Sequence, residues 1–366
     1  MVEWKKLGEV CEIGTGSNNR EDACDNGCYP FYVRSQEVLK IDSYSYDEEA
    51  ILIPGEGGIG DIFHYINGKY GLHQRTYRVH PITGDVKGRY IYYFLFANFK
   101  IYINAKSYKS TAASIRKPML LDFPIPIPSL EEQTRIVGIL DTFTSAIDNL
   151  KEQIAQRRKQ YEYYRDQLLD LEGKPGVEWF ELLELCDYVD YRGKTPSKVD
   201  AGIFLVTAKN IRKGYIDYDN SKEYISEDDY EEVMHRGKPQ IGDVLVTTEA
   251  PLGNVAQIDN ENIALAQRVI KYRPKDERLN SSYLKYILLG SEFQIRLEKE
   301  ATGATAKGIK GSKLHRMHIP LPPLSEQQRI VSILDTFEAS IQNLEAQLKQ
   351  REKQYEYYRN KLLTFE

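Results

Sequence analysis

A glycine-rich run, GEGGIG at residues 55–60, has the composition of a loop that binds a phosphate or an adenosyl cofactor. Such loops work because backbone N–H groups at the start of a following helix point at the phosphate. The next residues, IFHYINGKYG, lack the apolar spacing of an amphipathic helix. We therefore interpret the run as a turn or a bend in a strand, and predict no cofactor in this chain.

The cysteines do not form a recognisable metal or disulfide pattern. Cys24 and Cys28 could join His64 or His73 as zinc ligands, but the spacing matches no established zinc site. The residues DNG between the two cysteines are typical of a solvated turn. Four cysteines are also too few and too scattered for a disulfide framework in a chain of 366 residues. We predict reduced thiols and no metal site.

Two carboxylates, Asp243 and Glu249, flank a predicted strand in the way that the carboxylates of some nucleases do. No lysine stands two residues after Glu249 to complete that set. The chain also has no P-loop, and it has no NPPY-type or DPPY-type tetrapeptide of the kind that amino-group methyltransferases use to hold a target base. We therefore predict that the chain has no catalytic residues.

The basic residues are concentrated in a few segments, although the formal net charge of the chain is −5. Residues 62–121 contain ten lysines and arginines against the single acid Asp85, a net charge of +9, and residues 301–325 contain no acid. A local positive field suits the phosphate backbone of a nucleic acid. The residues predicted to contact that backbone are Lys106, Lys109, Arg116, Lys117, Lys307, Lys310 and Lys313.

The chain contains an internal duplication, which determines how these segments are organised. A shift of 194 residues aligns 129–172 with 323–366, with 27 identities in 44 positions, and both copies contain the heptapeptide KQYEYYR. A fainter similarity links VEWKKLGEVCE, from Val2, with VEWFELLELCD, from Val177. The order is therefore variable, constant, variable, constant.

Both constant segments are predicted to be long helices. Their apolar residues recur in alternating steps of four and three, which is the heptad pattern of a coiled coil. Each segment follows a proline run, and Ser129 and Ser325 fit N-cap positions. At ~1.5 Å rise per residue, each helix would be about 60 Å long. The predicted seam consists of Ile136, Leu140, Phe143, Ile147, Leu150, Ile154 and Tyr161 in the first copy, and Ile330, Leu334, Phe337, Ile341, Leu344, Leu348 and Tyr355 in the second.

An apolar stripe of this length needs a partner. A homodimeric coiled coil or a core helix would bury it, but pairing of the two copies within one chain is more economical. Chain order permits both directions, and we expect the antiparallel one because it places the two variable domains at opposite ends of the helix pair. Tyr163 and Tyr357 lie off the seam and are predicted to face a partner protein.

The variable segments have a different pattern. Short β-like runs such as FLVTAKNI and QIGDVLVTT alternate with helical stretches such as SSYLKYILLGSEFQIRLEKE, so we predict the α+β class for each domain. The sequence has no apolar run of 18 residues and no apolar segment near its start that would act as a secretory signal. We expect a cytoplasmic protein.

Taken together, these features resemble the DNA-specificity (S) subunit of type I restriction-modification systems. The resemblance covers the whole chain and rests on the duplicated helix with EQxRIVxILDTF, which follows a proline run and separates two dissimilar domains. RGKTPS (192–197), VTAKNI (206–211) and GDVLVTT (242–248) resemble motifs of the family's target recognition domains, as do YPFYVRSQEV and GKYGLHQRTYRV in the first domain.

This resemblance implies two α/β target recognition domains, at 1–128 and 173–322, and two conserved helical spacers, at 129–172 and 323–366, in a pseudo-two-fold arrangement. It implies a non-catalytic subunit in which each domain reads one half of a bipartite, asymmetric DNA target, while the helices set the gap. The same helices would dock two methyltransferase subunits, to which translocase-nuclease subunits can attach. S-adenosylmethionine, ATP and Mg would then be bound by the partner subunits. A helix of ~60 Å exceeds one turn of duplex, ~34 Å, which agrees with an unread spacer.

Reading of base edges needs forked or amide side chains on loops. From the loops that resemble the family, the predicted readers are Arg34, Ser35, Gln36, Gln74 and Arg75 in the first domain, and Lys194, Thr195, Lys209, Asn210, Gln267 and Arg268 in the second. For each of them, ordinary surface or structural hydrogen bonding is the alternative. Two other functions remain open for the chain: a coiled-coil scaffold or competitor that reads no sequence, and a stand-alone DNA-modifying enzyme.

Overall fold

The computed structural model describes residues 2–106, 114–191, 196–303 and 307–365, in two compact units. Unit 1 comprises Met1–Glu152 with Glu345–Glu366, and unit 2 comprises Gln153–Leu344, so each unit contains one variable domain and part of both long helices. Three of the predicted DNA-binding residues, Lys109, Lys194 and Thr195, lie outside the described residues. None of the described helices is long and apolar enough to cross a membrane.

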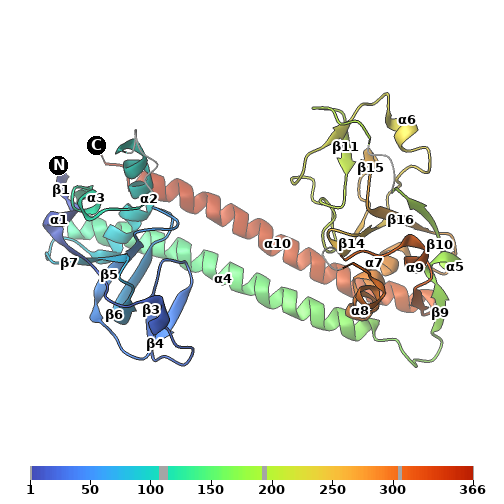
Figure 1. Cartoon of the computed structure of the whole chain (residues 1–366), viewed down its shortest axis with the longest axis horizontal. Helices are drawn as coiled ribbons and strands as arrows, with labels where there is room; N and C mark the ends of the chain where they lie inside the picture. The colour runs from blue at the N-terminus through green and yellow to red at the C-terminus, as the bar shows by residue number, and fades with distance from the viewer. Residues whose placement is uncertain (1, 107–113, 192–195, 304–306, 366) are drawn as a thin grey trace. The chain divides into compact units, whose positions relative to one another are not determined.

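Unit 1 is built on a six-stranded sheet with the order β2-β7-β5-β6-β3-β4, accompanied by the two-stranded sheet β1-β8. Helix α2 packs on one face of the large sheet, and α4 adds Ile136 and Leu140 to the same core (Figure 1). The elements of this unit are β1 (Glu3–Lys6), α1 (Leu7–Val10), β2 (Cys11–Thr15), the 3-10 turn η1 (Arg20–Asp22), β3 (Tyr29–Tyr32), β4 (Val38–Ile41), β5 (Tyr46–Pro54), β6 (His64–Leu72), β7 (Thr76–Pro81), α2 (Gly88–Lys106), α3 (Lys117–Leu121), β8 (Pro124–Ile127) and the start of α4 (Leu130–Leu169).

Unit 2 contains a four-stranded sheet, β10-β16-β13-β14, a three-stranded sheet, β12-β11-β15, and the pair β9-β17. Helices α7 and α8 and the start of α10 share a core with the four-stranded sheet. The elements of this unit are β9 (Glu178–Glu181), α5 (Leu182–Leu185), β10 (Cys186–Asp190), β11 (Ile203–Val206), β12 (Tyr224–Ile225), α6 (Tyr230–Val233), β13 (Val244–Thr248), β14 (Leu252–Gln257), β15 (Ile263–Leu265), β16 (Val269–Pro274), α7 (Ser281–Leu289), α8 (Ser291–Glu300), α9 (Gly311–Leu314), β17 (His318–Leu321) and the start of α10 (Leu324–Leu362).

The two units follow one plan, which confirms the predicted α+β class. In the large sheets, β2-β7-β5-β6 of unit 1 has the same order as β10-β16-β13-β14 of unit 2. The register also agrees: Ile51 lies opposite Val79 in unit 1, and 193 residues later Val244 lies opposite Tyr272 in unit 2. Residues of β5 and β7 can therefore be matched with residues of β13 and β16 at a shift of 193, even where their sequences differ.

The two long helices pair with each other and run antiparallel, as predicted. In unit 1, Phe143 of α4 stacks on Tyr358 of α10 with ring centroids 5.3 Å apart, and Lys151 lies 3.8 Å from Glu352. Residue numbers therefore rise along α4 as they fall along α10. In unit 2, Tyr164 of α4 stacks on Phe337 at 5.5 Å. All fourteen predicted seam residues are buried or half-buried.

The helix starts differ from the prediction in one detail. Ser129 caps α4 as expected, because its Oγ accepts a hydrogen bond from the Glu132 N–H at 3.2 Å. The cap predicted at Ser325 is wrong, because α10 begins at Leu324 and Ser325 lies inside the helix. The carbonyl of Pro323 accepts from the N–H groups of Glu326 and Gln327 and thus closes the first turn.

Each long helix is attached to its own domain by a buried glutamine at the same position of the repeat. Gln133 and Gln327 are both fully buried. Gln327 Nε2 donates to the carbonyls of Arg278 (2.7 Å) and Pro322 (2.8 Å), and its Oε1 accepts from the Asn280 N–H (2.9 Å). Gln133 makes the equivalent three bonds to the carbonyls of Asp85 and Pro128 and the N–H of Lys87.

The paired stacks on the seam give a direct test of helix pairing. We expect Phe143→Leu and Phe337→Leu each to lower the free energy of unfolding by about 1 kcal/mol, because each loses a stacked tyrosine, Tyr358 or Tyr164. The control is Tyr215→Leu, at a side chain that is 57% exposed, for which we expect little change. Urea unfolding measures all three, and equal stability of the three variants would contradict seam packing at these positions.

Candidate nucleic-acid interface

In unit 1 an arginine cluster gathers at the loops that connect the strands of the large sheet. Arg34 follows β3, Glu56 follows β5, and Arg75 precedes β7. One carboxylate oxygen of Glu56 holds both guanidinium groups, with Nη1 of Arg34 at 3.0 Å and Nη1 of Arg75 at 2.9 Å. The three side chains are 39–55% exposed. The sequence prediction placed Arg34 and Arg75 on loops, as found here, but it did not predict that they share a partner and it did not include Glu56.

The backbone of Arg75 is fixed more firmly than its side chain. Its carbonyl accepts from the Gly55 N–H at 2.9 Å, and its own N–H donates to Nδ1 of His73 at 3.0 Å. Burial, together with the charges of Arg34 and Arg75, lowers the pKa of His73, which keeps the ring neutral and able to accept this bond. Hydrogen bonding from Arg75 lowers the pKa of Glu56, so the carboxylate remains ionised at neutral pH.

The other predicted readers of the first domain lie in the same loops. The Ser35 hydroxyl donates to the carbonyl of Glu37 at 3.1 Å. Gln36 is exposed, and the Gln74 amide donates to Oδ1 of Asn19 at 2.6 Å. These side chains lie on the same loops as Arg34 and Arg75, and Ser35 and Gln74 are each held by a hydrogen bond within the domain.

Unit 2 has a similar pair. Glu249 follows β13, Arg268 precedes β16, and Nε of Arg268 lies 3.0 Å from the Glu249 carboxylate. The two side chains are 43% and 49% exposed. Arg268 has a φ of +67°, which residues other than glycine and asparagine rarely adopt. Its carbonyl accepts from the N–H (2.9 Å) and the hydroxyl (3.2 Å) of Thr248, so this conformation is held by the strand next to it.

The two pairs occupy matching positions. Because the strand registers correspond at a shift of 193, Glu56 matches Glu249 and Arg75 matches Arg268. The hydrogen bond from Gly55 to the Arg75 carbonyl matches the bond from Thr248 to the Arg268 carbonyl. The glutamates were missed because the only signal for them in the sequence is this shared spacing, and Glu249 had been considered as a nuclease carboxylate instead.

A basic residue also lies beside each pair. The N–H of Ile115 donates to the Gly55 carbonyl at 2.7 Å, and the N–H of Ile309 donates to the Thr248 carbonyl at 3.0 Å. These bonds bring the following residues, Arg116 and Lys310, to the ends of β5 and β13. Arg116 and Lys310 are both exposed, and each precedes the first residue of a short helix, α3 or α9.

The remaining basic residues predicted to contact phosphate lie at the surface or at element ends. Lys106 is the last residue of α2, and Lys117 and Lys307 are exposed. Lys313 is also exposed but forms an ion pair with Glu300 at 2.9 Å.

Three other predicted readers of the second domain, Lys209, Asn210 and Gln267, differ in their exposure. Asn210 is fully buried; its Oδ1 accepts from Thr207, and its Nδ2 donates to the carbonyls of Asp217 and Asn220. The prediction that Asn210 reads a base is therefore wrong, because its amide is used to close this loop. Lys209 next to it is exposed, and Gln267 is half-buried.

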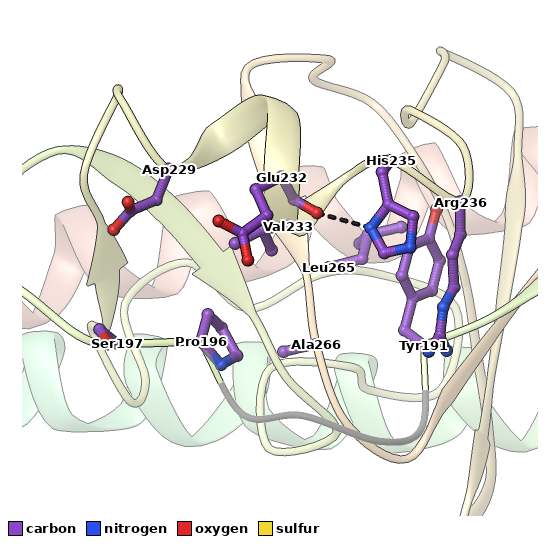
Figure 2. Close-up of a pocket in the computed structure, with 10 residues that line it drawn as sticks. All are labelled: Tyr191, Pro196, Ser197, Asp229, Glu232, Val233, His235, Arg236, Leu265 and Ala266. Carbon is purple, nitrogen blue, oxygen red and sulfur yellow. Dashed lines mark hydrogen bonds between the residues drawn. The ribbon is translucent and has the colours of Figure 1, made fainter.

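A pocket of about 170 Å³ in unit 2 is lined by residues in and around α6 and by residues at the end of β15. Figure 2 shows its lining, which includes Tyr191 and Ser197, and the hydrogen bond at 2.6 Å between Nδ1 of His235 and the carbonyl of Glu232. Asp229 and Glu232 place two carboxylates in this lining. The two acids face one arginine, Arg236, in the lining, whereas each glutamate–arginine pair has a further basic residue beside it, so we place the candidate interface at the pairs.

The glycine-rich run, the cysteines and Asp243 had been considered as cofactor, metal or nuclease sites, and each has a structural explanation instead. Residues 55–60 form a turn between β5 and β6, as predicted. All four cysteines are free thiols, with Cys11 and Cys186 buried. Within the described part of the chain, no group of three or more histidines, cysteines and acids could hold a metal ion. Asp243 is buried against Lys271 and Arg273.

Comparison with known proteins identifies relatives over the whole chain. The family model described as type I restriction modification DNA specificity domain matches twice, at residues 1–157 and 176–352. A Haemophilus influenzae protein named "putative type I restriction enzyme specificity subunit" is 30% identical over 390 residues, which cover 100% of this chain and 96% of that protein. The EcoR124I/EcoR124II specificity subunit of Escherichia coli is 33% identical over 262 residues, which cover 66% of this chain and 63% of that protein.

The fold has a solved counterpart. The crystal structure of a type I restriction-modification S subunit from M. genitalium superposes with a TM-score of 0.66 and covers 100% of this chain and 97% of that one, at 15% identity. At this level of identity the similarity concerns the fold alone.

Proposed function

Because the chain belongs to the family of type I restriction-modification DNA specificity subunits, we propose that it recognises a bipartite, asymmetric DNA target and is not itself an enzyme. Like its family, it binds DNA and assembles with other subunits of a restriction-modification complex. In this proposal residues 1–128 and 173–322 each read one half-site, and the helical spacers at 129–172 and 323–366 set the distance between the half-sites.

The observation that carries the proposal is the duplicated plan of the two units. Both have the same strand order, and both present an exposed glutamate–arginine pair at matched loops with a basic residue beside it. Arginine forks on loops are suited to reading base edges, while lysines on the same surface are suited to phosphate. The other side chains of these loops differ between the domains, which supports two different half-sites.

The helices supply the proposed surface for partner subunits. Tyr163 and Tyr357 occupy matching positions of the repeat and are 59% and 60% exposed. The first copy carries a net charge of −3 and the second −1, so this surface disfavours DNA. In this proposal two methyltransferase subunits bind this surface, and translocase-nuclease subunits attach to the methyltransferase subunits. S-adenosylmethionine, ATP and Mg belong to those partners, and the complex works in the cytoplasm.

The test is to co-express the chain with its methyltransferase subunit and to map adenine methylation across the genome. We expect one motif with two specified halves and an unspecified spacer of fixed length. A folded complex that methylates no bipartite motif would overturn the proposal.

One alternative is supported by the helix pair alone, because a coiled-coil scaffold or competitor needs no base reading. It predicts that binding of the complex to its best DNA site never exceeds binding to unrelated DNA at any salt concentration. A specific site bound at least a thousandfold more tightly than unrelated DNA, roughly the lower end for specific binders, would exclude the scaffold.

A further inference from the structure

We propose that Arg75 and Arg268 each read a guanine, one in each half-site, and that Glu56 and Glu249 are positioning residues that hold the two guanidinium groups in the reading orientation. This inference rests on the proposed function and identifies which side chains determine specificity. It also gives a role to two acidic residues that would otherwise be unexpected on a surface proposed to bind DNA, because DNA is itself negatively charged.

Stability does not account for these ion pairs. Their side chains are 39–55% exposed, and exposed ion pairs contribute little to the stability of a fold. The pairs nevertheless occur at the same place in two domains whose surrounding loops differ in sequence: Glu56 is followed by GGIG and Glu249 by APLG. A feature repeated without a stabilising effect indicates a shared task at the surface.

The backbone geometry supports the same conclusion. Each arginine carbonyl accepts a hydrogen bond from the residue just before the glutamate, Gly55 or Thr248, and the side chain of the same arginine pairs with that glutamate. At Arg268 this hydrogen bond maintains a φ of +67°. Sparsely populated backbone conformations in non-glycine residues concentrate at functional sites, because the surrounding structure must hold them in place.

The chemistry of the pair suits a G·C base pair. Arginine donates two parallel hydrogen bonds to O6 and N7 of guanine, and the best pairings of this kind discriminate strongly between bases. A carboxylate that binds one edge of the guanidinium leaves the other nitrogens available and fixes the plane of the fork. The same carboxylate can accept from N4 of cytosine, and it repels phosphate, so the arginine is kept from binding the backbone non-specifically.

The two domains differ in one respect that matters for the test. Glu56 holds Arg34 as well as Arg75, so unit 1 places two guanidinium groups on one carboxylate, whereas Glu249 is bonded to Arg268 through Nε. Loss of the glutamate should therefore have the simpler effect in unit 2. The test is accordingly built on Glu249 and Arg268, with Arg75 as the matched variant in the other domain.

The experiment uses the complete complex with its methyltransferase subunits and the wild-type recognition motif, obtained by methylation mapping. Arg268→Lys keeps the positive charge and can adopt the same backbone conformation, but it loses the planar guanidinium group that donates two parallel hydrogen bonds. We expect it to weaken binding to the wild-type site about ten- to a hundredfold and to relax one guanine in one half-site. Arg75→Lys should relax a guanine in the other half-site only.

Glu249→Gln tests the positioning role, because it keeps the shape and removes the charge. We expect a smaller loss of affinity and relaxation at the same base as in Arg268→Lys, with an unchanged unfolding midpoint. The matched control is Lys238→Gln, which breaks the exposed ion pair Lys238–Glu231 (2.6 Å) of the same unit. It should leave the motif and the affinity unchanged.

Three results would overturn the inference. Variants that keep the wild-type motif and affinity would show that these arginines do not read bases. An equal change in binding on all DNA sequences, with no base of the motif relaxed, would identify a phosphate contact instead, because lysine keeps the positive charge. A wild-type complex without any bipartite motif would overturn the proposed function itself, and this outcome is recognised before any variant is measured.

Discussion

Replacing Asp243 by alanine is expected to lower the free energy of unfolding by about 3–5 kcal/mol, the cost of leaving a buried charge without its partner. Asp243 is 2% exposed and lies 3.0 Å from Nζ of Lys271, which is 3% exposed. Arg273 adds two bonds to the same carboxylate, at 2.6 and 2.7 Å. Alanine would leave the Lys271 ammonium in the sheet of unit 2 without this carboxylate.

The dependence of this effect on pH has a definite sign. Burial opposes ionisation of Asp243, but hydrogen bonds from Arg273 and Lys271 outweigh it and lower the pKa of the carboxyl below its ordinary value. A group whose folded pKa is depressed stabilises the fold above its unfolded pKa of about 3.9, and this contribution is lost as pH falls through the folded pKa. The wild type should therefore lose stability on acidification through this region, whereas Asp243→Ala should lack this part of the loss.

At alkaline pH the variant should behave differently again. Burial lowers the pKa of Lys271 even in the wild type. Without Asp243 the ammonium loses its stabilising partner, so its pKa falls further. Between this lowered folded pKa and the unfolded pKa of about 10.4, the unfolded state binds more protons than the folded state, so the stability of Asp243→Ala should rise with pH across this interval.

Urea unfolding at several pH values measures these effects, with Glu231→Gln as the exposed control. A double variant, Asp243→Leu with Lys271→Met, should recover much of the loss, because well-packed apolar residues can replace a buried pair. A loss below about 1 kcal/mol for Asp243→Ala, comparable to an exposed pair, would contradict this account.

The helices and their pairing could be predicted from the sequence because heptad spacing is a local signal repeated over many residues. The pattern placed a helix within 129–172, and α4 spans Leu130–Leu169. The same pattern indicated a stripe that two copies could bury in each other, and Phe143 and Phe337 do contact tyrosines of the opposite helix. The seam nevertheless serves a second purpose: Leu140 and Leu334 are buried in the domain cores.

The candidate interface was only partly predictable, because its side chains converge through sheet register and not through sequence proximity. The loops that resemble the family indicated Arg75 and Arg268, but Glu56 and Glu249 stand 19 residues earlier and meet them only after β5 and β13 pair with β7 and β16. Asn210 was misassigned for a related reason: composition cannot distinguish an amide that points outward from one that closes its own loop.

The same limitation concealed the residues that join each domain to its helix. Gln133 and Gln327 stand in the EQxRIV motif beside the exposed Thr134 and Gln328, and nothing local separates the buried residues from the exposed ones. The hydrogen-bond partners of Gln327 come from outside the motif, namely from the loop before α7 and from the proline run before α10. The recurrence of glutamine at the same position of both helices therefore indicated a structural role, although a polar residue at a helix start would ordinarily be expected on the surface.

Replacing Gln327 by leucine is therefore expected to destabilise unit 2 by about 3–5 kcal/mol. Leucine fits a similar volume, but the Asn280 N–H and the carbonyls of Arg278 and Pro322 lose their partner in a buried site. Each buried polar group left unpaired costs about 1–3 kcal/mol. Gln133→Leu should give a loss of the same size in unit 1, since its three bonds are equivalent.

The neighbouring residue provides the matched control. Gln328→Leu makes the same chemical change one position further along α10, where the side chain is exposed, and we expect it to change stability by less than about 0.5 kcal/mol. Chemical denaturation of the three variants compares them directly. If Gln327→Leu were as mild as Gln328→Leu, then packing of Ile330 and Leu334 into the core, and not the amide, would hold the helix to its domain.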